Sequence, residues 1–297
     1  MELRLLRYFL AVAQEESISA AAEYLHLTQP TLSRQMIALE EELGKPLFIR
    51  GKRRISLTQD GMRLRKRANE ILELADKTQA EFRNTEETVA GDVYIGAGET
   101  DAMRLIARTS GILQQQYPDL RFHIFSGDRV DVVEHLEKGL IDFALLVGEV
   151  DSKKYDTLLL PVRDSWSVLM PKDHPLAKQE AIRPQDLWDQ PLTLSRQMRD
   201  GSPLLNWMGK PLSQLHVVST HNLIYNASLM VEEGFSLAVT LDKLINTTGE
   251  SRLCYRPLEP RLEVEVHLVW KKHQVMSKAV EAFLNQFQKD LQVSADE

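Results

Sequence analysis

Apolar residues in the segment after Thr28 recur at steps of four, three and four, which places them on one side of a helix. These residues are Leu32, Met36, Leu39 and Leu43. Thr28 stands at the N-cap position, and Pro30 is tolerated in the first turn because no intrahelical donor is lost there. The pattern predicts a helix with one buried side and a polar side that carries Gln29, Ser33 and Arg34.

A shorter helix is predicted just before this one. Ser19 can cap it, and the three alanines from Ala20 to Ala22 allow close approach of a second helix. His26 to Thr28 supplies the turn, so the segment is typical of a helix-turn-helix. In that unit the first residues of the second helix meet base edges, and Gln and Arg suit adenine and guanine. An ordinary pair of antiparallel helices with a solvated outer face remains an alternative.

Two short strands are predicted between Leu47 and Thr58, after Gly44 and Pro46 end the helix. The tip between them, Arg50 to Arg54, is basic, as expected for a hairpin that lies against phosphates. This hairpin would be the wing of a winged helix-turn-helix.

The next segment predicts a long helix that is capped by Thr58 and continues to about residue 88. Within it, small and apolar residues keep a strict four-three spacing, which indicates a heptad seam for dimerisation. The seam consists of Leu64, Ala68, Ile71, Ala75, Thr78 and Phe82. The alternative is a helix that packs against its own domain. Residues 85–91 are predicted to form the hinge to the rest of the chain.

From Asp92 onward the pattern changes to short apolar runs that alternate with helical spacing, which predicts parallel β-α-β units. The first set has runs at 93–98, 121–127 and 142–148, with helices near 100–116 and 129–138. A second set has runs at 166–170, 192–195, 216–220 and 236–240. A last run at 263–270 precedes a C-terminal helix at about 277–291, so the chain is expected to return to the first set.

Charge is distributed unevenly along the chain. Residues 1–67 hold twelve Lys and Arg against eight Asp and Glu, a net charge of +4, although the whole chain has −7. Four of the basic residues, Arg63, Arg65, Lys66 and Arg67, lie at the start of the long helix. Positive charge confined to the part that carries the base-reading helix is expected of a phosphate-binding surface.

Three segments together resemble the DNA-binding end of LysR-type transcriptional regulators: Phe9 to Val12, Ser19 to Leu43, and the PLF-x-R…LT-x-x-G string from Pro46 to Gly61. One departure is Ile49, where the family often has a polar residue. The resemblance implies an α/β fold overall: an α-rich winged helix-turn-helix, a long linker helix and two α/β subdomains of the periplasmic-binding-protein type. The expected boundaries are 1–58 for the DNA-binding domain, 59–91 for the linker helix and hinge, and 92–297 for the effector-binding domain. Within the last, subdomain I is expected at about 92–161 and 268–297, and subdomain II at about 162–267.

The same resemblance implies roles for individual residues. Gln29, Pro30, Ser33 and Arg34 would contact bases or adjacent phosphates, whereas Thr28, Thr31, Arg50 and Arg53 would mainly hold the DNA backbone. Similar proteins dimerise in antiparallel fashion through the linker helix and often assemble further into tetramers.

The effector cleft is expected where parallel strands end and helices begin, because free amides and the helix dipole converge there. By resemblance to the family, the cleft would involve Glu99, Thr100, Asp101, Ser126, Ser195, Arg196, His221 and Asn222. The alternative is that these are ordinary loop and capping residues. Glu99 and Asp101 depart from the uncharged residues that are common there. They favour an effector with a cationic or hydrogen-bond-donating group, combined with an acidic group that reaches Arg196.

Three classes of function compete: an enzyme, a solute-binding protein and a DNA-binding regulator. An enzyme is disfavoured because G-x-S-x-G, Walker and metal-ligand motifs are missing, and neither a cofactor nor a metal is expected. A solute-binding protein of a transporter would fit residues 92–297, but the first ninety residues and the absence of a recognisable signal peptide argue against it. No membrane span is expected either. The lone Cys254 excludes an intrachain disulfide, as expected in the cytoplasm.

The sequence therefore favours the third class, a cytoplasmic, sequence-specific DNA-binding transcriptional regulator modulated by a small-molecule effector. Its expected partners are double-stranded DNA, the effector, further copies of itself in a homodimer or homotetramer, and RNA polymerase.

Overall fold

A computed structural model describes residues 1–51, 54–83 and 89–296. The chain divides into two compact units, Met1–Arg83 and Asn84–Glu297. Each unit has its own hydrophobic core.

The first unit begins with three helices, α1 (Leu3–Glu15), α2 (Ile18–Tyr24) and α3 (Gln29–Leu43). Phe9, Leu32 and Leu39 are completely buried in its core, as the apolar spacing predicts. Leu43 is 38% exposed, so its predicted burial is wrong. It is the last residue of α3, and Gly44, in the left-handed conformation, turns the chain away directly after it.

The helix caps differ in part from the prediction. The side chain of Ser17, not that of Ser19, caps α2 by accepting a hydrogen bond from the amide of Ala20. Thr28 stands at the N-cap of α3 as predicted, but its hydroxyl pairs with the hydroxyl of Thr31 at 2.8 Å instead of with a free amide.

The predicted hairpin is present as β1 (Phe48–Arg50) and β2 (Ile55–Leu57), which are antiparallel with Ile49 opposite Ser56. A carboxylate of α3 fixes its start: Oε1 of Glu40 accepts hydrogen bonds from the amides of Leu47 at 2.6 Å and Phe48 at 3.1 Å. The tip residues 52–53 lie outside the described part.

The long helix is α4 (Gln59–Arg83), and Thr58 caps it by accepting a hydrogen bond from the amide of Gly61 at 2.9 Å. Near its start the helix packs on its own unit, where Ala68 and Leu72 are buried. Near its end Phe82 is 86% exposed. Residues 85–88 of the predicted hinge lie outside the described part, and Gly91 already belongs to the next strand.

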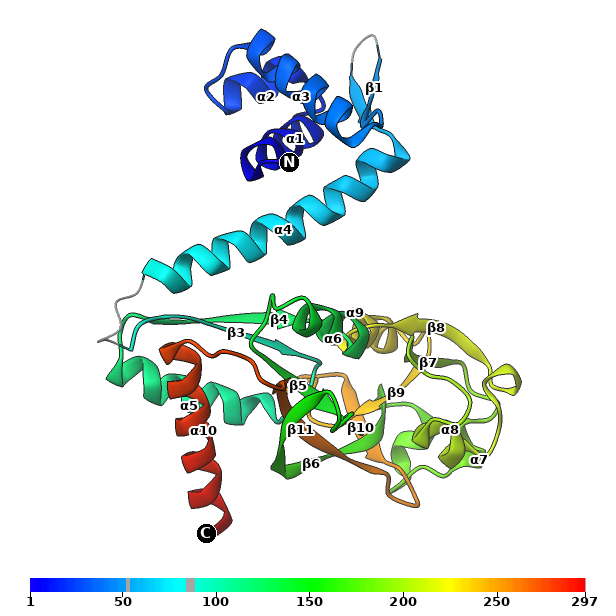
Figure 1. Cartoon of the computed structure of the whole chain (residues 1–297). Helices are drawn as coiled ribbons and strands as arrows, with labels where there is room; N and C mark the ends of the chain where they lie inside the picture. Colours follow the sequence, from blue (N-terminus) through cyan, green and yellow to red (C-terminus); the bar gives the residue numbers. More distant parts are fainter. Residues whose placement is uncertain (52–53, 84–88, 297) are drawn as a thin grey trace. The chain divides into compact units, whose positions relative to one another are not determined.

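The second unit has two lobes. Lobe I contains the parallel strands β3 (Gly91–Ala97), β4 (Leu120–Ser126) and β5 (Phe143–Val147). Helices α5 (Met103–Gln116) and α6 (Arg129–Glu137) connect them, and the C-terminal helix α10 (Lys278–Asp296) packs beside α5 (Figure 1).

Lobe II contains β7 (Leu192–Ser195), β8 (Val217–His221) and β9 (Leu237–Leu241), with β7 parallel to both others. Its helix α9 (Ile224–Glu232) leads from β8 to β9. Lobe II also contains β10 (Leu253–Pro257), α7 (Pro184–Leu187), α8 (Pro203–Met208) and the 3-10 helices η1 (Pro175–Lys178) and η2 (Leu212–Gln214).

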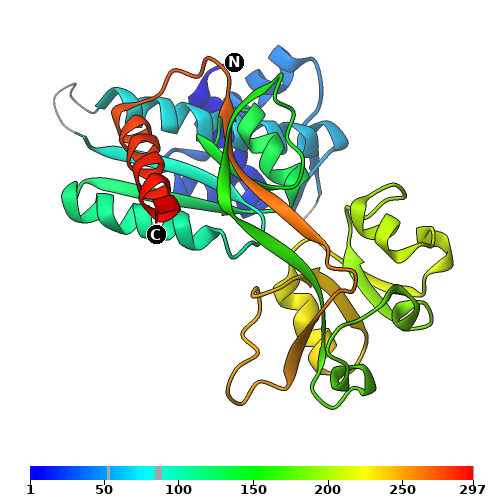
Figure 2. The same ribbon diagram turned by 90° about the horizontal axis from the view of Figure 1, so that it is seen from below.

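Two antiparallel strands connect the lobes. β6 (Tyr155–Pro171) pairs with β11 (Glu263–Lys271) and also with β9 of lobe II. Figure 2 shows the green β6 and the orange β11 running side by side from one lobe to the other. Polar side chains at the ends of the parallel strands also connect the two lobes: Arg196, directly after β7, binds Asp128, directly before α6.

Candidate functional site

The first candidate site is the outer side of α3. Thr28, Gln29, Pro30 and Arg34 are exposed there, and Thr31 and Ser33 are half-buried. Nε of Arg34 donates to the carbonyl of Pro30 at 3.3 Å, which directs the guanidinium along the first turn of the helix. This end of α3 therefore presents bidentate amide and guanidinium groups to solvent, as groove reading requires.

The wing lies beside this face because Glu40 anchors it to α3. Arg50 ends β1, but its side chain and the whole of Arg53 lie outside the described part. Arg54 pairs with Glu16 at 3.0 Å. On α4, Arg63 and Arg67 form intrahelical ion pairs with Asp60 and Glu70.

The second candidate site is a cavity of about 230 Å³ between lobes I and II. Four of the predicted effector residues, Glu99, Ser195, His221 and Asn222, line it. Apolar residues of both lobes, among them Leu145 and Met198, form much of the remaining wall. The cavity lies at the carboxyl ends of the parallel strands, where α/β proteins commonly bind ligands.

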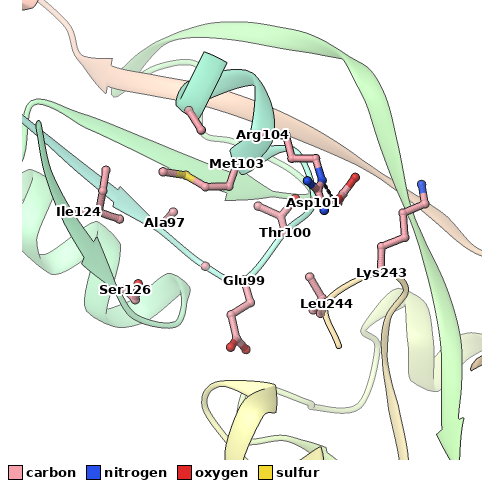
Figure 3. A pocket seen from close by; sticks show the side chains of 12 residues that line it. Ala97, Glu99, Thr100, Asp101, Met103, Arg104, Ile124, Ser126, Lys243 and Leu244 are labelled. Carbon is pink, nitrogen blue, oxygen red and sulfur yellow. Dashed lines mark hydrogen bonds and ion pairs between the residues drawn. The ribbon is translucent and has the colours of Figure 1, made fainter. Parts of the chain in front are cut away.

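A larger pocket of about 380 Å³ shares Gly98, Glu99 and Leu244 with this cavity (Figure 3). Thr100, Asp101 and Ser126 line it. Figure 3 shows Asp101 paired with Arg104, at 2.7 Å, while the Glu99 side chain points away from that pair. The structure therefore divides the predicted cleft residues between two pockets that share Glu99.

Arg196, the remaining predicted residue, links the two lobes. From the end of β7 its Nε donates to Oδ2 of Asp128, and its Nη2 donates to Asp131 at 2.8 Å. Asp128 also caps α6 by accepting the amides of Val130 and Asp131. Burial would raise the pKa of Asp128, but the hydrogen bonds from Arg196 and the backbone outweigh this and lower it. The carboxylate is therefore charged at neutral pH. We call Arg196, Asp128 and Asp131 the latch.

A second link crosses the cavity, because Glu99 of lobe I accepts a hydrogen bond from the amide of Ile224, the first residue of α9. The carboxylate thereby occupies the positive end of that helix. Both Glu99 and Asp101 thus have partners within the chain, a backbone amide for Glu99 and the guanidinium of Arg104 for Asp101.

Thr100 binds one of the two strands that connect the lobes. It is buried, and its hydroxyl donates to Asp164 of β6 at 2.5 Å. Burial raises the pKa of Asp164, and the nearby Asp242 and Asp101 raise it further, although the hydrogen bond from Thr100 opposes this. A carboxyl group that resists ionisation therefore stands on a strand that joins the lobes.

Two side chains that line the cavity contain buried polar atoms with no hydrogen-bond partner of normal geometry among the described residues. These atoms are Nε1 of Trp166 and both ring nitrogens of His221. Burial lowers the pKa of His221, with a smaller opposing effect from the backbone of Leu223, so the ring is neutral at pH 7.

The strand-end argument places residues 126–128, which include Asp128, at the cleft, but the resemblance to the family did not single out Asp128, and neither argument named Trp166. Asp128 had a signal, because it ends a strand run and precedes an apolar helical pattern, as an N-cap does. Trp166 had none, since in the sequence it is only the first residue of an apolar strand run at 166–170.

Comparison with known proteins gives two family matches. Residues 3–62 match the bacterial regulatory helix-turn-helix protein model of the lysR family, and residues 86–292 match the LysR substrate binding domain model. The Hca operon transcriptional activator HcaR of Escherichia coli is 30% identical over 290 residues, which are 96% of each chain. A probable RuBisCO transcriptional regulator of Synechocystis is 33% identical over 185 residues, 62% of this chain. The match spans 54% of that regulator, little more than half its length.

Among solved structures, CbnR, a LysR family transcriptional regulator, has a TM-score of 0.75 with 20% identity and covers 98% of this chain and 99% of its own. Full-length CbnR in complex with its target DNA gives a TM-score of 0.74, again at 20% identity, over 97% of this chain and 99% of that one. These likenesses establish the fold of both units. Within the described residues no helix has the length and apolar character to cross a bilayer.

Proposed function

The chain belongs to the LysR family of bacterial regulatory helix-turn-helix proteins, and from that membership we propose that it is a sequence-specific transcriptional regulator controlled by a small-molecule effector. One observation carries the proposal: the same chain joins an exposed, Gln- and Arg-bearing start of α3, with a wing anchored beside it, to a two-lobed unit with a cavity. The first feature suits reading of the major groove, and the second suits small-molecule binding.

In this proposal Gln29, Pro30, Ser33 and Arg34 contact bases or adjacent phosphates. Thr28, Thr31, Arg50 and Arg53 hold the DNA backbone. The protein works in the cytoplasm as a homodimer formed through α4, which assembles further into a tetramer and acts on RNA polymerase. The exposed end of α4, with Phe82, supports self-association, because a large apolar side chain gains free energy when a second copy covers it. Two recognition helices then meet two half-sites.

The effector acts by differential binding. A ligand changes an equilibrium only if its affinity differs between the two arrangements of the protein. The cavity is bounded by both lobes, so a ligand there contacts both lobes at once only while they are closed on each other. Binding therefore favours the closed arrangement, and the proposal is that this arrangement alters how the paired recognition helices sit on DNA.

Selection of DNA from random and genomic fragments tests the proposal, with affinity measured against salt concentration for the selected and scrambled sequences. We expect a dyad-symmetric site whose specificity ratio is about 10³ or more. If only salt-sensitive, sequence-blind binding is obtained, also in the presence of metabolite mixtures, the regulator proposal is wrong.

A further inference from the structure

Each charge of the latch already has an opposite charge bound to it. Arg196 binds the carboxylates of Asp128 and Asp131, and Asp128 also accepts two backbone amides. A ligand could use Arg196 only by displacing the nearly inaccessible Asp128. Removal of one partner from a buried ion pair is strongly unfavourable. The latch therefore offers no counter-charge to a ligand.

Two other charged side chains of the cavity wall, Glu99 and Arg129, lack such a partner. Glu99 accepts a hydrogen bond from the amide of Ile224, and Arg129 donates to the carbonyls of Val147 and Glu149. No hydrogen bond or ion pair among the described residues brings an opposite charge to either group. Backbone dipoles bind a charged group but leave its net charge in place. One negative and one positive charge of the wall are therefore free to bind a ligand.

The surroundings of Arg129 favour an anion beside it. Burial lowers the pKa of the Arg129 guanidinium, and the nearby cation Arg199 also lowers it, although Tyr155 and the exposed Glu149 oppose this. The guanidinium stays protonated, because arginine ionises far above neutral pH. A cation that has lost part of its hydration and has a second cation nearby gains more from an anionic partner than a fully hydrated one does. The negative end of a ligand is therefore expected at Arg129.

The two charged groups begin at the carboxyl ends of neighbouring strands. β3 and β5 are parallel, with Ala97 opposite Leu145. Two residues beyond this pair the chain reaches Glu99 and Val147. The carbonyl of Val147 accepts from Arg129 at 3.0 Å. Since neighbouring strands lie about 4.8 Å apart, one small molecule at this edge of the sheet can reach both charges.

The rest of the wall restricts the ligand further. A space of about 230 Å³ exceeds the roughly 150 Å³ that holds one benzene molecule, but it is smaller than the pockets of drug-sized ligands. Its walls include Leu145 and Val147 from lobe I and Met198 and Val239 from lobe II. A branched aliphatic chain or a single ring fits this volume and this apolar lining.

We propose that the cavity takes an α-amino acid with an apolar side chain, whose carboxylate binds Arg129 and whose ammonium group binds Glu99. This inference rests on the proposed function, since it specifies the effector of that same cavity. It retains the combination of a cationic and an acidic group that the sequence favours, but the acidic group binds Arg129 instead of Arg196. The apolar side chain of the ligand contacts both lobes and acts together with the latch to hold them closed.

Isothermal titration calorimetry on the full-length protein at pH 7 tests the inference with probes of matched shape. L-leucine is compared with isocaproate, which lacks the ammonium group, and with isopentylamine, which lacks the carboxylate. L-phenylalanine is compared with hydrocinnamate and phenethylamine in the same way. At least one of the amino acids is expected to bind tenfold or more tighter than both of its singly charged counterparts, because each counterpart leaves one charge of the wall without a partner.

Substitutions that remove one charge assign the two ends of the ligand. Arg129→Gln should weaken binding of the amino acid tenfold or more. Glu99→Gln retains an oxygen for the amide of Ile224 and should also weaken the amino acid tenfold or more, but it should strengthen binding of the carboxylate probe, because a repelling charge is removed. Arg108→Gln and Glu250→Gln are the matched controls, since both residues are exposed and neither lines the cavity.

Tighter binding of a carboxylate or amine probe than of both amino acids would overturn the inference, as would failure of both amino acids to bind at millimolar concentration. Effects of Arg129→Gln and Glu99→Gln that do not exceed those of the controls would also overturn it. The ranking of the probes on the wild-type protein does not depend on the folding of any variant. Binding of the selected DNA is measured on the same preparations, so specific DNA binding without amino-acid binding refutes the ligand class alone.

Discussion

Oε1 of Glu40 accepts a hydrogen bond from the amide of Leu47 at 2.6 Å, so one carboxylate of the recognition helix holds the start of the wing. The amide of Phe48 shares the same oxygen. In the proposed complex with DNA, base reading by α3 and backbone contact by the wing would therefore be coupled through a single side chain.

Glu40→Ala should lower the free energy of unfolding by about 1–3 kcal/mol, because two amides lose their acceptor. It should also weaken binding of the selected DNA, because the wing is no longer fixed to α3. Urea denaturation and fluorescence anisotropy measure the two effects. The exposed Glu41→Ala is the control with the same change of charge. If both variants behave alike, the anchor has no role.

Arg34→Ala should weaken binding to the selected DNA by about 1–3 kcal/mol and relax the preference at one base position, if Arg34 makes one bidentate base contact. Arg53→Ala should instead weaken all DNA alike and reduce the salt slope by about one unit. Anisotropy titrations on selected and scrambled DNA separate the two effects. Arg108→Ala, an exposed change on α5, controls for net charge. Equal losses on both DNAs for Arg34 and Arg53 would contradict the division of roles.

Phe82→Asp should shift the dimer toward monomer at micromolar concentration, because it places a charge on an exposed apolar position of the α4 seam. Sedimentation velocity measures the shift. Gln79→Asp adds the same charge at an exposed position of α4 outside the predicted seam and should leave the assembly unchanged. An unaltered dimer in Phe82→Asp would remove α4 as the dimer interface and leave packing on its own unit as its role.

Arg196→Ala should lower the melting temperature of the second unit, because it leaves the nearly inaccessible Asp128 carboxylate without its guanidinium partner. The pKa of Asp128 is lowered in the folded protein, so its stabilising contribution is complete above the ordinary value of about 4. The contribution is lost as the pH falls through the lowered pKa. Thermal unfolding of wild type and Arg196→Ala from pH 3 to 8 should therefore differ above about pH 4 and converge below it. A constant difference over this range would mean that Asp128 is not the relevant partner.

Asp164→Asn should raise the melting temperature at pH 8 more than at pH 5. The pKa of Asp164 is raised in the folded state, so the folded protein binds this proton more tightly than the unfolded chain. The wild type accordingly loses stability as the pH rises from about 4 through the raised pKa. Asn removes the charge yet still accepts from Thr100. Asp164→Ala removes the acceptor as well and should be less stable than Asp164→Asn. The reverse order would refute this account of the contact between Thr100 and Asp164.

The helix-turn-helix could be predicted because its signals are local. The spacing of Leu32, Met36 and Leu39 alone determines which side of α3 is buried. In β6 the prediction covered only 166–170 of a strand that begins at Tyr155, because Arg163 and Asp164 interrupt the apolar pattern. Those charged residues are accommodated by partners from other elements, such as Thr100.

The cleft was predicted less completely, because its contacts also depend on partners that lie far away in the sequence. Sequence reasoning placed Arg196 near a ligand, but its partners Asp128 and Asp131 are more than sixty positions away and belong to the other lobe. Strand ends indicate where a cleft lies. Whether its charges are free for a ligand depends on pairings that only the assembled lobes create.

The path of the chain through β6 and β11 has a consequence for synthesis on the ribosome. Phe283 and Phe287 of α10 are fully buried in the same core as Val93 and Phe143, which lie far earlier in the chain. Lobe II is therefore inserted in the sequence of lobe I, and its residues emerge before the segment that completes lobe I. During translation the nascent polypeptide must hold the first strands of lobe I unfinished, with apolar surface exposed, until the residues of α10 leave the exit tunnel.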